Sequence, residues 1–372
     1  MRQCSILADR RDRPRPPADW STIIARVLGI VGTGLIGGSI GLAARAAGWE
    51  VLGLDDPGTL ELAQAVGAIG HPGAIDEIRG ADLIVLAAPI ADICARLAEL
   101  APTDALVTDV GSAKARIVRA AETAGIERFV GGHPMAGSQL AGVANASASL
   151  FHAARYFLTP TLTTVADAYA DVAQFVQRDL GATTTAVDPA KHDLLVAALS
   201  HLPHLMAVAL LSVASEISPE ALAFAGPSFR DLTRVGSANP RLWSDILAEN
   251  EPALRTAVEA FTAAMGELEH NIPDREEIAR RFALAGEAYS ALGGMLIEQS
   301  GRTVEVAIPV RNHPGVLATV TTLMGSNDIN ILDLYVRHMD THRAALVLTI
   351  DAGVSARAQE LLRSADFTTE SV

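Results

Sequence analysis

The chain has 372 residues, which is enough for two or three domains. It carries 29 basic and 43 acidic residues, a net charge of −14, which argues against a nucleic-acid partner because phosphate binding needs a basic face. Its two cysteines, Cys4 and Cys94, provide neither a disulfide framework nor a metal cluster. We therefore expect a cytoplasmic protein without a metal.

The most apolar stretches do not predict membrane spans. Residues 29–47 hold a glycine-rich loop and its helix, and residues 194–214 contain His201, Pro203 and His204. A spanning helix needs about 20 mostly apolar residues without such interruptions. Residues 1–26 mix arginines, prolines and aspartates without the apolar core of a signal peptide. We expect a disordered tail there, or a start codon assigned too early.

Alternating strands and helices from residue 27 predict a nucleotide-binding Rossmann domain over residues 27–190. Near-continuous apolar strands that alternate with helices indicate a doubly wound parallel sheet of the α/β class. A first helix is expected over residues 39–47. The expected strands cover residues 27–31, 50–54, 82–88, 105–108, 128–130, 156–158 and 183–187.

The character of the chain changes after Asp188-Pro189, which predicts a helix N-cap and first turn. Residues 191–299 have helical periodicity and alanine-rich faces, so we expect an all-α substrate and dimerisation domain. After a linker at Ser300-Gly301-Arg302, residues 303–372 switch again. Their strands (303–310, 330–337, 344–350) and helices (315–324, 356–363) follow a β-α-β-β-α order, the start of a ferredoxin-like α+β fold.

A glycine loop follows the first strand. Gly32, Gly34 and Gly37 match G-x-G-x-x-G between a strand and a helix. In this motif the first glycine forms the turn, the second admits a pyrophosphate, and the third lets helix and strand pack. Leu35 and Ile36, between the last two glycines, are expected to contact the cofactor, and the N-terminal amides of the following helix would face the phosphates. The loop therefore predicts a dinucleotide site.

Asp55 ends the second strand about 20 residues further on, where a carboxylate accepts hydrogen bonds from ribose hydroxyls. Its charge would repel a 2′-phosphate, so the sequence favours NAD over NADP. A solvated loop acid is the alternative for Asp55. Ala88 and Pro89, at a further strand end, are expected to form a wall beside the adenine, or only to end that strand.

His133 lies at another strand exit, between Gly131-Gly132 and Pro134. Ligands of open α/β sheets bind beyond the carboxyl ends of the strands, so His133 is expected to lie near a nicotinamide. The two glycines are expected to let the backbone pass close to the ligand. An imidazole titrates near neutral pH and suits a general base.

These ordered motifs resemble the prephenate/arogenate dehydrogenases of the TyrA family, over about residues 27–298. Besides the glycine loop and the His133 segment, the resemblance rests on Thr108-Asp109-Val110-Gly111-Ser112-Ala113-Lys114, His192-Asp193, Ser200-His201-Leu202-Pro203-His204, Phe229-Arg230-Asp231-Leu232-Thr233-Arg234, Asn239-Pro240 and Trp243. The tail, with Asn312-His313-Pro314-Gly315 and Asn330-Ile331, looks like an ACT domain, a small amino-acid-sensing module.

The resemblance implies NAD-dependent oxidative decarboxylation of prephenate to 4-hydroxyphenylpyruvate, on the route to tyrosine. His133 would take the proton of the C4 hydroxyl. Ser112 would bond the same hydroxyl or orient the imidazole. For Ser112, an N-cap of a helix over residues 113–124 is the alternative.

Arg234 is the expected carboxylate clamp, because a guanidinium matches a carboxylate bidentately. The family positions suggest that His204 and, further away, His201 face the substrate side chain. Arg230 and Trp243 would close the pocket, with interface packing as the alternative for Trp243. A metal at the two histidines is disfavoured, since no acidic or thiol partner accompanies them.

Two other functions stay open. Arogenate dehydrogenase differs by an amino group on the substrate, and a non-catalytic sensor of NAD and an amino acid would keep only the fold. The intact Ser112, His133 and Arg234 argue against the sensor. Gln139 stands where some relatives have a glutamate, and we do not assign it a role in the chemistry.

The tail is expected to bind a regulatory amino acid, most simply tyrosine, at the interface of a homodimer. Asn312, Gly315 and Asn330 lie in loops where such ligands bind in ACT domains. A tail that only adds dimer contacts is the alternative.

Overall fold

The computed structural model describes residues 26–136, 140–218, 220–297, 303–311, 316–338 and 343–371. The chain divides into two compact units: residues up to Ala223 with Leu232–Ala260, and Phe224–Asp231 with the chain from Phe261 onward. This division separates the chain at other points than the three domains expected from the sequence, whose boundaries stay a prediction. The expected N-terminal tail lies outside the described residues, apart from Arg26.

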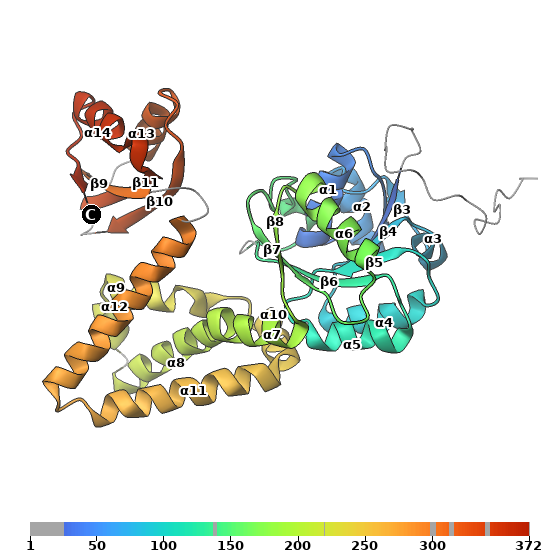
Figure 1. The fold of residues 1–372 in the computed structure, drawn as a ribbon, viewed down its shortest axis with the longest axis horizontal. Helices are drawn as coiled ribbons and strands as arrows, with labels where there is room; N and C mark the ends of the chain where they lie inside the picture. The colour runs from blue at the N-terminus through green and yellow to red at the C-terminus, as the bar shows by residue number, and fades with distance from the viewer. Residues whose placement is uncertain are drawn as a thin grey trace, which may run out of the picture. The chain divides into compact units, whose positions relative to one another are not determined.

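The first unit is built on an eight-stranded sheet in the order β3-β2-β1-β4-β5-β6-β7-β8 (Figure 1). Its strands are β1 (Val27–Val31), β2 (Glu50–Leu54), β3 (His71–Pro72), β4 (Leu83–Leu86), β5 (Leu106–Asp109), β6 (Phe129–Pro134), β7 (Arg155–Thr159) and β8 (Thr183–Ala186). The pairings from β3 to β6 are parallel, which confirms the Rossmann-like sheet. The two-residue β3 was not expected.

The prediction of a parallel sheet throughout is wrong at its far edge. β7 runs antiparallel to β6, and β8 runs parallel to β7. A parallel neighbour requires a crossover, usually a helix of three turns or more. The described part of the β6–β7 connection holds only η2 (Val143–Asn145), so the chain returns in the opposite direction.

Helices cover both faces of the sheet, as a doubly wound fold requires. On one face α1 (Leu35–Ala46) and α6 (Ala166–Gln174) bury Ile40 and Val172 against alternate strand residues such as Leu28 and Val85. The other face carries α3 (Ile75–Arg79), α4 (Ile90–Leu100) and α5 (Ala115–Ala124), packed on Ile84, Leu86 and Val107. The short α2 (Pro57–Ala65) lies beside α1, on the first face (Figure 1).

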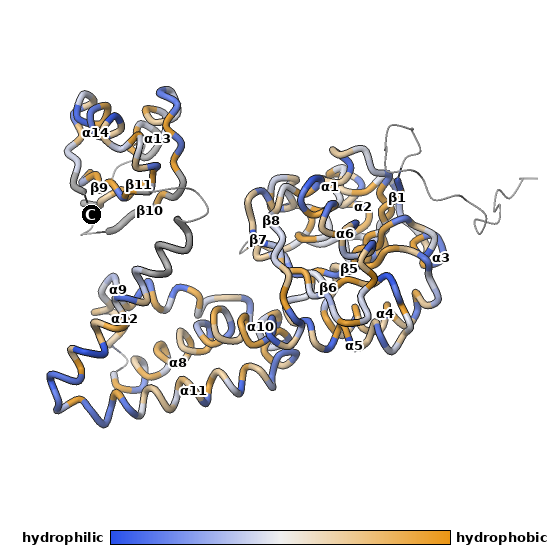
Figure 2. Tube along the Cα trace, viewed as in Figure 1, coloured by the Kyte–Doolittle hydropathy of each residue, from blue (hydrophilic) through white to orange (hydrophobic). Residues whose placement is uncertain are grey.

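A long helical stretch follows β8. It consists of α7 (Pro189–Val196), the π-helical turn η4 (Ala197–His201) and α8 (Leu202–Ile217). By length and hydropathy alone, Pro189–Ile217 could cross a membrane, and only 22% of its most apolar window is buried within the chain. Figure 2 shows that α8 is hydrophobic along most of its length.

The remaining helices confirm the helical character predicted after residue 191. They are η5 (Ala221–Phe224), α9 (Pro227–Thr233), η6 (Arg234–Ser237), α10 (Pro240–Glu249), α11 (Glu251–His270) and α12 (Arg275–Ile297). No strand lies between β8 and Thr303 in the part of this segment that the structure describes.

The C-terminal segment forms a small antiparallel sheet in the order β10-β11-β9-β12. Its elements are β9 (Thr303–Arg311), α13 (Val316–Gly325), β10 (Ile331–His338), β11 (Arg343–Asp351), η7 (Ala352–Val354), α14 (Ser355–Ser364) and β12 (Glu370–Ser371). The β-α-β-β-α order is confirmed, and β12 adds a short edge strand. Val306, Leu348, Val320 and Leu362 join both helices to one face of the sheet.

Gly131 and Gly132 have a packing role in the sheet, and the expectation that they let the backbone approach a ligand stays a prediction. A Cβ at Gly131 would lie 2.4 Å from the Thr159 hydroxyl on β7, and one at Gly132 would lie 2.6 Å from the Asp109 carbonyl on β5. The two glycines therefore allow β6 to lie close to both neighbouring strands immediately before His133.

This contact predicts that Gly132→Ala lowers the thermal unfolding midpoint, because overpacking a fixed site costs about 1–3 kcal/mol. Gly286→Ala is the matched control, since no described atom beyond its own helix backbone lies within 4 Å of the added Cβ and alanine favours a helix. Differential scanning calorimetry of both variants checks this. A Gly132→Ala midpoint equal to the wild-type value would contradict the assignment.

Candidate active site

The glycine loop leaves β1 with each glycine in a distinct physical role. Gly32 has φ +90°, and a Cβ there would lie 2.4 Å from the Ala87 carbonyl oxygen. A Cβ at Gly37 would lie 1.9 Å from the Gly32 carbonyl oxygen. Gly34 has no described protein atom within 4 Å of its Cβ position, so no protein contact demands a glycine there. That is the position where a pyrophosphate approaches the backbone.

The N-terminus of α1 suits an anion. Gly34 is its N-cap and offers no side-chain hydrogen bond to the first-turn amides, and no acidic residue lies in that turn. The amides at Leu35 and Ile36 and the positive end of the helix dipole are thus available for phosphate oxygens.

Asp55 is anchored to the glycine loop. Its Oδ2 accepts hydrogen bonds from the Thr33 amide at 2.6 Å and the Thr33 hydroxyl at 3.2 Å, and its Oδ1 accepts from the Asp56 amide at 2.8 Å. Asp56 has a different task, because it caps α2 by accepting from Thr59. Asp55 is therefore a fixed carboxylate beside the loop rather than a solvated loop acid.

Ala88 and Pro89 also lie at this edge of the sheet. The Ala87–Ala88 peptide lies against Gly32, and Pro89 is the N-cap of α4. Since β1, β2, β4, β5 and β6 are parallel, the residues that follow them meet along one edge. This edge brings the glycine loop together with Ser112 and His133.

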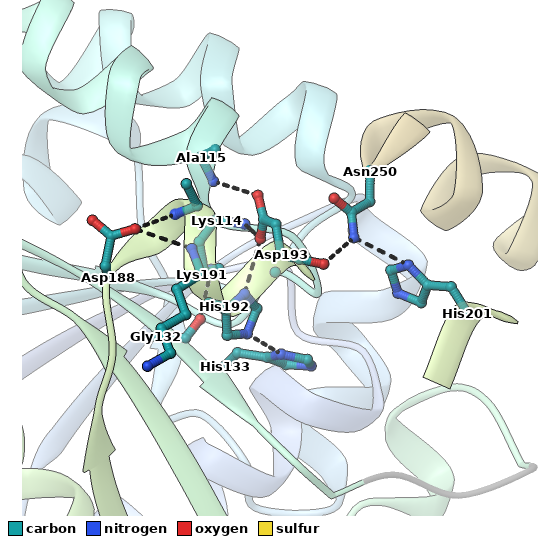
Figure 3. Close-up of polar contacts among 12 residues, drawn as sticks. Lys114, Ala115, Gly132, His133, Asp188, Lys191, His192, Asp193, His201 and Asn250 are labelled. Atoms are coloured by element: carbon teal, nitrogen blue, oxygen red, sulfur yellow. Dashed lines mark hydrogen bonds and ion pairs between the residues drawn. The ribbon is translucent and has the colours of Figure 1, made fainter. Parts of the chain in front are cut away.

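His133 is the outer member of a relay of side chains (Figure 3). Its Nδ1 lies 2.9 Å from Nε2 of His192, and Nδ1 of His192 lies 2.9 Å from Oδ1 of Asp193. His192 and Asp193 are buried at the start of α7, whereas His133 is half-buried. Their contacts join β6 to the helical stretch.

The relay fixes the tautomers of both rings. The Asp193 carboxylate only accepts, so Nδ1 of His192 carries a proton, and Nε2 of the neutral ring accepts. His133 must then donate from Nδ1, which leaves a lone pair on Nε2. Burial lowers the pKa of His133 well below its ordinary value, and His192, Lys114 and His201 lower it further. His133 is therefore a neutral imidazole with a free basic nitrogen.

Asp193 also caps a helix of the nucleotide domain. Its two oxygens accept from the Lys114 amide at 2.7 Å and the Ala115 amide at 2.8 Å, at the start of α5. The alternative role of Ser112 as N-cap is therefore wrong, because α5 begins later than expected and takes its cap from another helix. Ser112 is half-buried, next to this edge of the sheet, with no hydroxyl hydrogen bond to a described residue.

A second group of polar side chains lies on the helical stretch. His201 is 2% exposed, and its Nδ1 accepts from Nδ2 of Asn250 at 3.2 Å. The same amide donates to the Asp193 carbonyl at 2.9 Å, which links this group to the relay. Trp243 stacks on His204 at 3.5 Å between ring centroids and meets His201 edge-on at 6.0 Å. His201 is thus held inside, beneath the Trp243–His204 pair.

The π-helical turn accounts for the position of these histidines. Pro203 lacks an N–H and would collide with the carbonyl four residues earlier in a regular α-helix. The chain widens instead, with the Leu202 amide bonded to the Ala197 carbonyl. Nδ1 of His204 donates to the Ser200 carbonyl at 2.8 Å, which leaves its Nε2 free.

Arg234 begins η6, which lies directly against α8. A Cβ at Gly236 would lie 2.8 Å from the Leu211 side chain, so a glycine permits this approach. Arg234 is exposed, and no carboxylate within the described ranges pairs with its guanidinium. Arg230 is exposed on α9 in the second compact unit, and its part in the site stays a prediction.

Other predicted site residues lie at the edge of what the structure describes. Asn330 is exposed directly before β10. Asn312, Gly315 and Gln139 lie outside the described residues. Within the described ranges, no three His, Cys, Asp or Glu side chains cluster as metal ligands would.

The sequence analysis missed the supporting residues of the relay. His192-Asp193 was noted only as part of the resemblance, and neither the buried Asp109 and Lys114 nor Asn250 was assigned a role. A buried Asp-x-x-x-x-Lys after a strand and a His-Asp pair in the first turn of a helix were the available signals.

Comparison with known proteins decides the family. A family model described as "Prephenate dehydrogenase, nucleotide-binding domain" matches residues 40–185, and "Prephenate dehydrogenase, dimerization domain" matches residues 188–283. The prephenate dehydrogenase of Bacillus subtilis is 30% identical over 327 residues, covering 82% of this chain and 86% of that protein. The chain belongs to the prephenate dehydrogenase family.

Both a prephenate dehydrogenase and an arogenate dehydrogenase of known structure are similar to this chain. The structure of prephenate dehydrogenase from A. aeolicus in complex with hydroxyphenyl propionate and NAD⁺ superposes with a TM-score of 0.66 at 29% identity, covering 73% of this chain and 99% of that chain. The Synechocystis arogenate dehydrogenase gives a TM-score of 0.65 at 31% identity, covering 72% and 99%. Family membership therefore fixes the fold of the nucleotide-binding and helical domains without choosing between the two substrates.

The buried His201 predicts a pH-dependent stability. Burial lowers its pKa from 6.5 to about 4 in the folded chain, so the unfolded chain binds the proton more readily. The stabilisation from neutral His201 is complete above pH 6.5 and is lost as the pH falls toward 4. Urea unfolding across this range should show a shallower pH slope for His201→Asn than for wild type. His71→Gln, an exposed control, should keep the wild-type slope, and an equal slope in all three proteins would contradict the prediction.

Proposed function

We propose that this chain catalyses the NAD-dependent oxidative decarboxylation of prephenate to 4-hydroxyphenylpyruvate, in tyrosine biosynthesis. The observation that carries this proposal is the relay that leaves Nε2 of His133 basic at the nucleotide edge of the sheet. Membership of the prephenate dehydrogenase family supports the same reaction.

The nucleotide site fits NAD. The open backbone at Gly34 and the uncapped amides of α1 suit a pyrophosphate, and Asp55 suits the ribose hydroxyls. The carboxylate of Asp55 would repel a 2′-phosphate, which favours NAD over NADP. When bound, NAD⁺ supplies the hydride acceptor.

The remaining chemistry falls to the side chains of the chain. His133 Nε2 takes the C4 hydroxyl proton, so that the C4–H bond can break with its electron pair. The C1–carboxylate bond then breaks, carbon dioxide leaves, and the electron pair of that bond completes the aromatic ring. His133 then returns the proton to the C4 oxygen, which gives the phenol of the product. Ser112 lies at the neighbouring strand end, and we assign it a hydrogen bond to the same hydroxyl.

Two carboxylates of prephenate need cationic or hydrogen-bonding partners. Arg234 suits one of them, because its guanidinium is exposed on η6 and pairs with no described carboxylate. His204 and Trp243 form a stacked wall whose free Nε2 suits the side chain of the substrate. We assign His201 to the support of this wall, and Arg230 to closure of the pocket.

The basic nitrogen on His133 predicts a specific loss of the chemical step. His133→Asn should reduce kcat by about 10²–10⁴-fold, the usual contribution of a general base, while NAD⁺ binding stays unchanged. His192→Gln should give a smaller loss, because His133 keeps its nitrogen and loses only its fixed tautomer. Steady-state rates and NAD⁺ titration calorimetry measure both effects. Wild-type turnover in His133→Asn would contradict the base assignment.

The runner-up is arogenate dehydrogenase, with the same chemistry on a substrate that carries an amino group. It is supported by the similarity to the Synechocystis arogenate dehydrogenase and to the cyclohexadienyl dehydrogenase of Zymomonas mobilis, 30% identical over 262 residues. A sensor without activity is disfavoured by the complete relay.

We further propose a homodimer with a regulatory C-terminal domain of the ACT type. Apolar side chains exposed on α8, among them Val208, Val213 and Ile217, suit burial against a second copy. The order β10-β11-β9-β12 is that of a ferredoxin-like sheet, which is the ACT architecture. Tyrosine is the proposed effector, bound near Asn312, Gly315 and Asn330.

Reduction of NAD⁺ followed by absorbance tests these assignments with prephenate and with arogenate, each with and without tyrosine. We expect turnover of prephenate and inhibition by tyrosine. Turnover of arogenate alone would favour the runner-up, and turnover of neither would favour the sensor. A chain that ends before Thr303 should keep catalysis and lose the response to tyrosine, whereas a retained response would place the inhibitor elsewhere.

A further inference from the structure

Lysine is rare in this chain, and one of its two lysines is completely buried. Only Lys114 and Lys191 occur among the 29 basic residues, and arginine supplies the others. Lys191 is exposed on α7, whereas Lys114 has an exposed fraction of 0%. A compact ammonium therefore occupies a site between β5 and α5 where a planar guanidinium would need more room.

The buried ammonium and its partner hold the backbone next to His133. Lys114 Nζ forms an ion pair with the fully buried Asp109 and donates to the Gly132 carbonyl at 2.6 Å. Asp109 in turn accepts from the Gly132 amide at 3.1 Å and the Gly111 amide at 2.8 Å. Both polar groups of Gly132, the residue before His133, are thus bound by the same ion pair.

The backbone of Lys114 reaches the ring of His133 by a separate route. Its amide donates to Asp193 at 2.7 Å, and Asp193 bonds to His192, which bonds to His133 (Figure 3). Lys114 therefore contacts both ends of the hydrogen-bonded series that runs from Asp193 through His192 to His133. Its side chain fixes the backbone beside His133, and its amide fixes the carboxylate that orients the imidazole.

We propose that the buried Lys114–Asp109 ion pair is a positioning element for His133, which holds it in place and keeps it in its basic, uncharged form. This inference rests on the proposed function only for the role of His133 as base. Lys114 and Asp109 themselves are not expected to touch the substrate.

The titratable groups around His133 come from four parts of the chain. His192 and Asp193 face it from α7, His201 from η4, Asp109 from β5, and Lys114 from the segment before α5. The buried phenol of Tyr156 on β7 is uncharged, since burial raises its pKa.

Among these groups, the ammonium of Lys114 opposes protonation of His133, and Asp109 offsets that effect. Burial lowers the pKa of Lys114, and the ion pair with Asp109 opposes that shift. Removing either member alone should therefore shift the protonation of His133, in opposite directions.

The first test is the pH profile of kcat/KM. In Lys114→Met, the acid limb should move to higher pH by about half a unit or more, with kcat reduced about tenfold and the affinity for NAD⁺ unchanged. In Asp109→Asn, the limb should move to lower pH. Lys191→Met, which removes the exposed lysine, should match wild type. The inference is overturned if the limb of folded Lys114→Met stays at the wild-type pH, whatever its rate.

A second measurement needs no variant of the pair and no turnover. Protein labelled with ¹³C-lysine gives only two side-chain Cε signals, and Lys191→Met assigns them. The Lys114 signal should keep the shift of a charged ammonium from about pH 6 to 8. A neutral amine in that range would overturn the inference, and it would do so even if Lys114→Met failed to fold.

Failure of the proposed function can be told apart from failure of this inference. If the wild-type protein turns over neither prephenate nor arogenate, the proposed function is wrong and no pH profile of kcat/KM can be measured. The carbethoxylation rate of His133, followed by peptide mass spectrometry against pH, then reports its protonation directly. A Lys114→Met protein whose His133 modification profile matches wild type would overturn the positioning role.

Discussion

The carboxylate of Asp193 ties together the parts of the chain that the site requires. It caps α5 of the nucleotide domain through the amides of Lys114 and Ala115, and it bonds to His192 on its own helix. A carboxylate offers about four lone-pair positions, so one residue can serve both a helix N-terminus and an imidazole. Because Asp193 lies near the start of the long helical stretch, the cap also fixes where that stretch leaves the sheet.

Close backbone approach is the second physical requirement of the site. Gly32 and Gly37 let the loop fold against β4 and itself, and Gly131 and Gly132 let β6 lie against β5 and β7. In each case a Cβ would come within 2.6 Å of another atom. The glycines thus act on the positions of the Asp55 carboxylate, directly after β2, and of the His133 imidazole, near the end of β6.

The helical stretch Pro189–Ile217 is long and apolar enough to cross a membrane. It also carries polar side chains of the candidate site. Its first turn carries His192 and Asp193, its π-helical turn carries His201, and α8 carries His204. The stretch lies within residues 188–283, which match the family model of the prephenate dehydrogenase dimerization domain. Hydropathy alone cannot distinguish a surface that meets lipid from one that meets another protein chain.

Local patterns in the sequence determined the elements and their chemistry. The G-x-G-x-x-G spacing predicted the nucleotide loop, the acid at the next strand end predicted the role of Asp55, and the periodicity separated the sheet, the helices and the small C-terminal sheet. Each of these signals depends on residues close together in the sequence, so it can be recognised without the structure. Only the tertiary structure decided three other features. They are the reversed direction of β7 and β8, the packing role of Gly131 and Gly132, and the helix cap that Asp193 supplies in place of Ser112. Each depends on which distant segment lies alongside, and Lys114 and Asp193 are separated by almost eighty residues. No periodicity encodes a partner at that separation, because burial and hydrogen bonding select it only once the chain has folded.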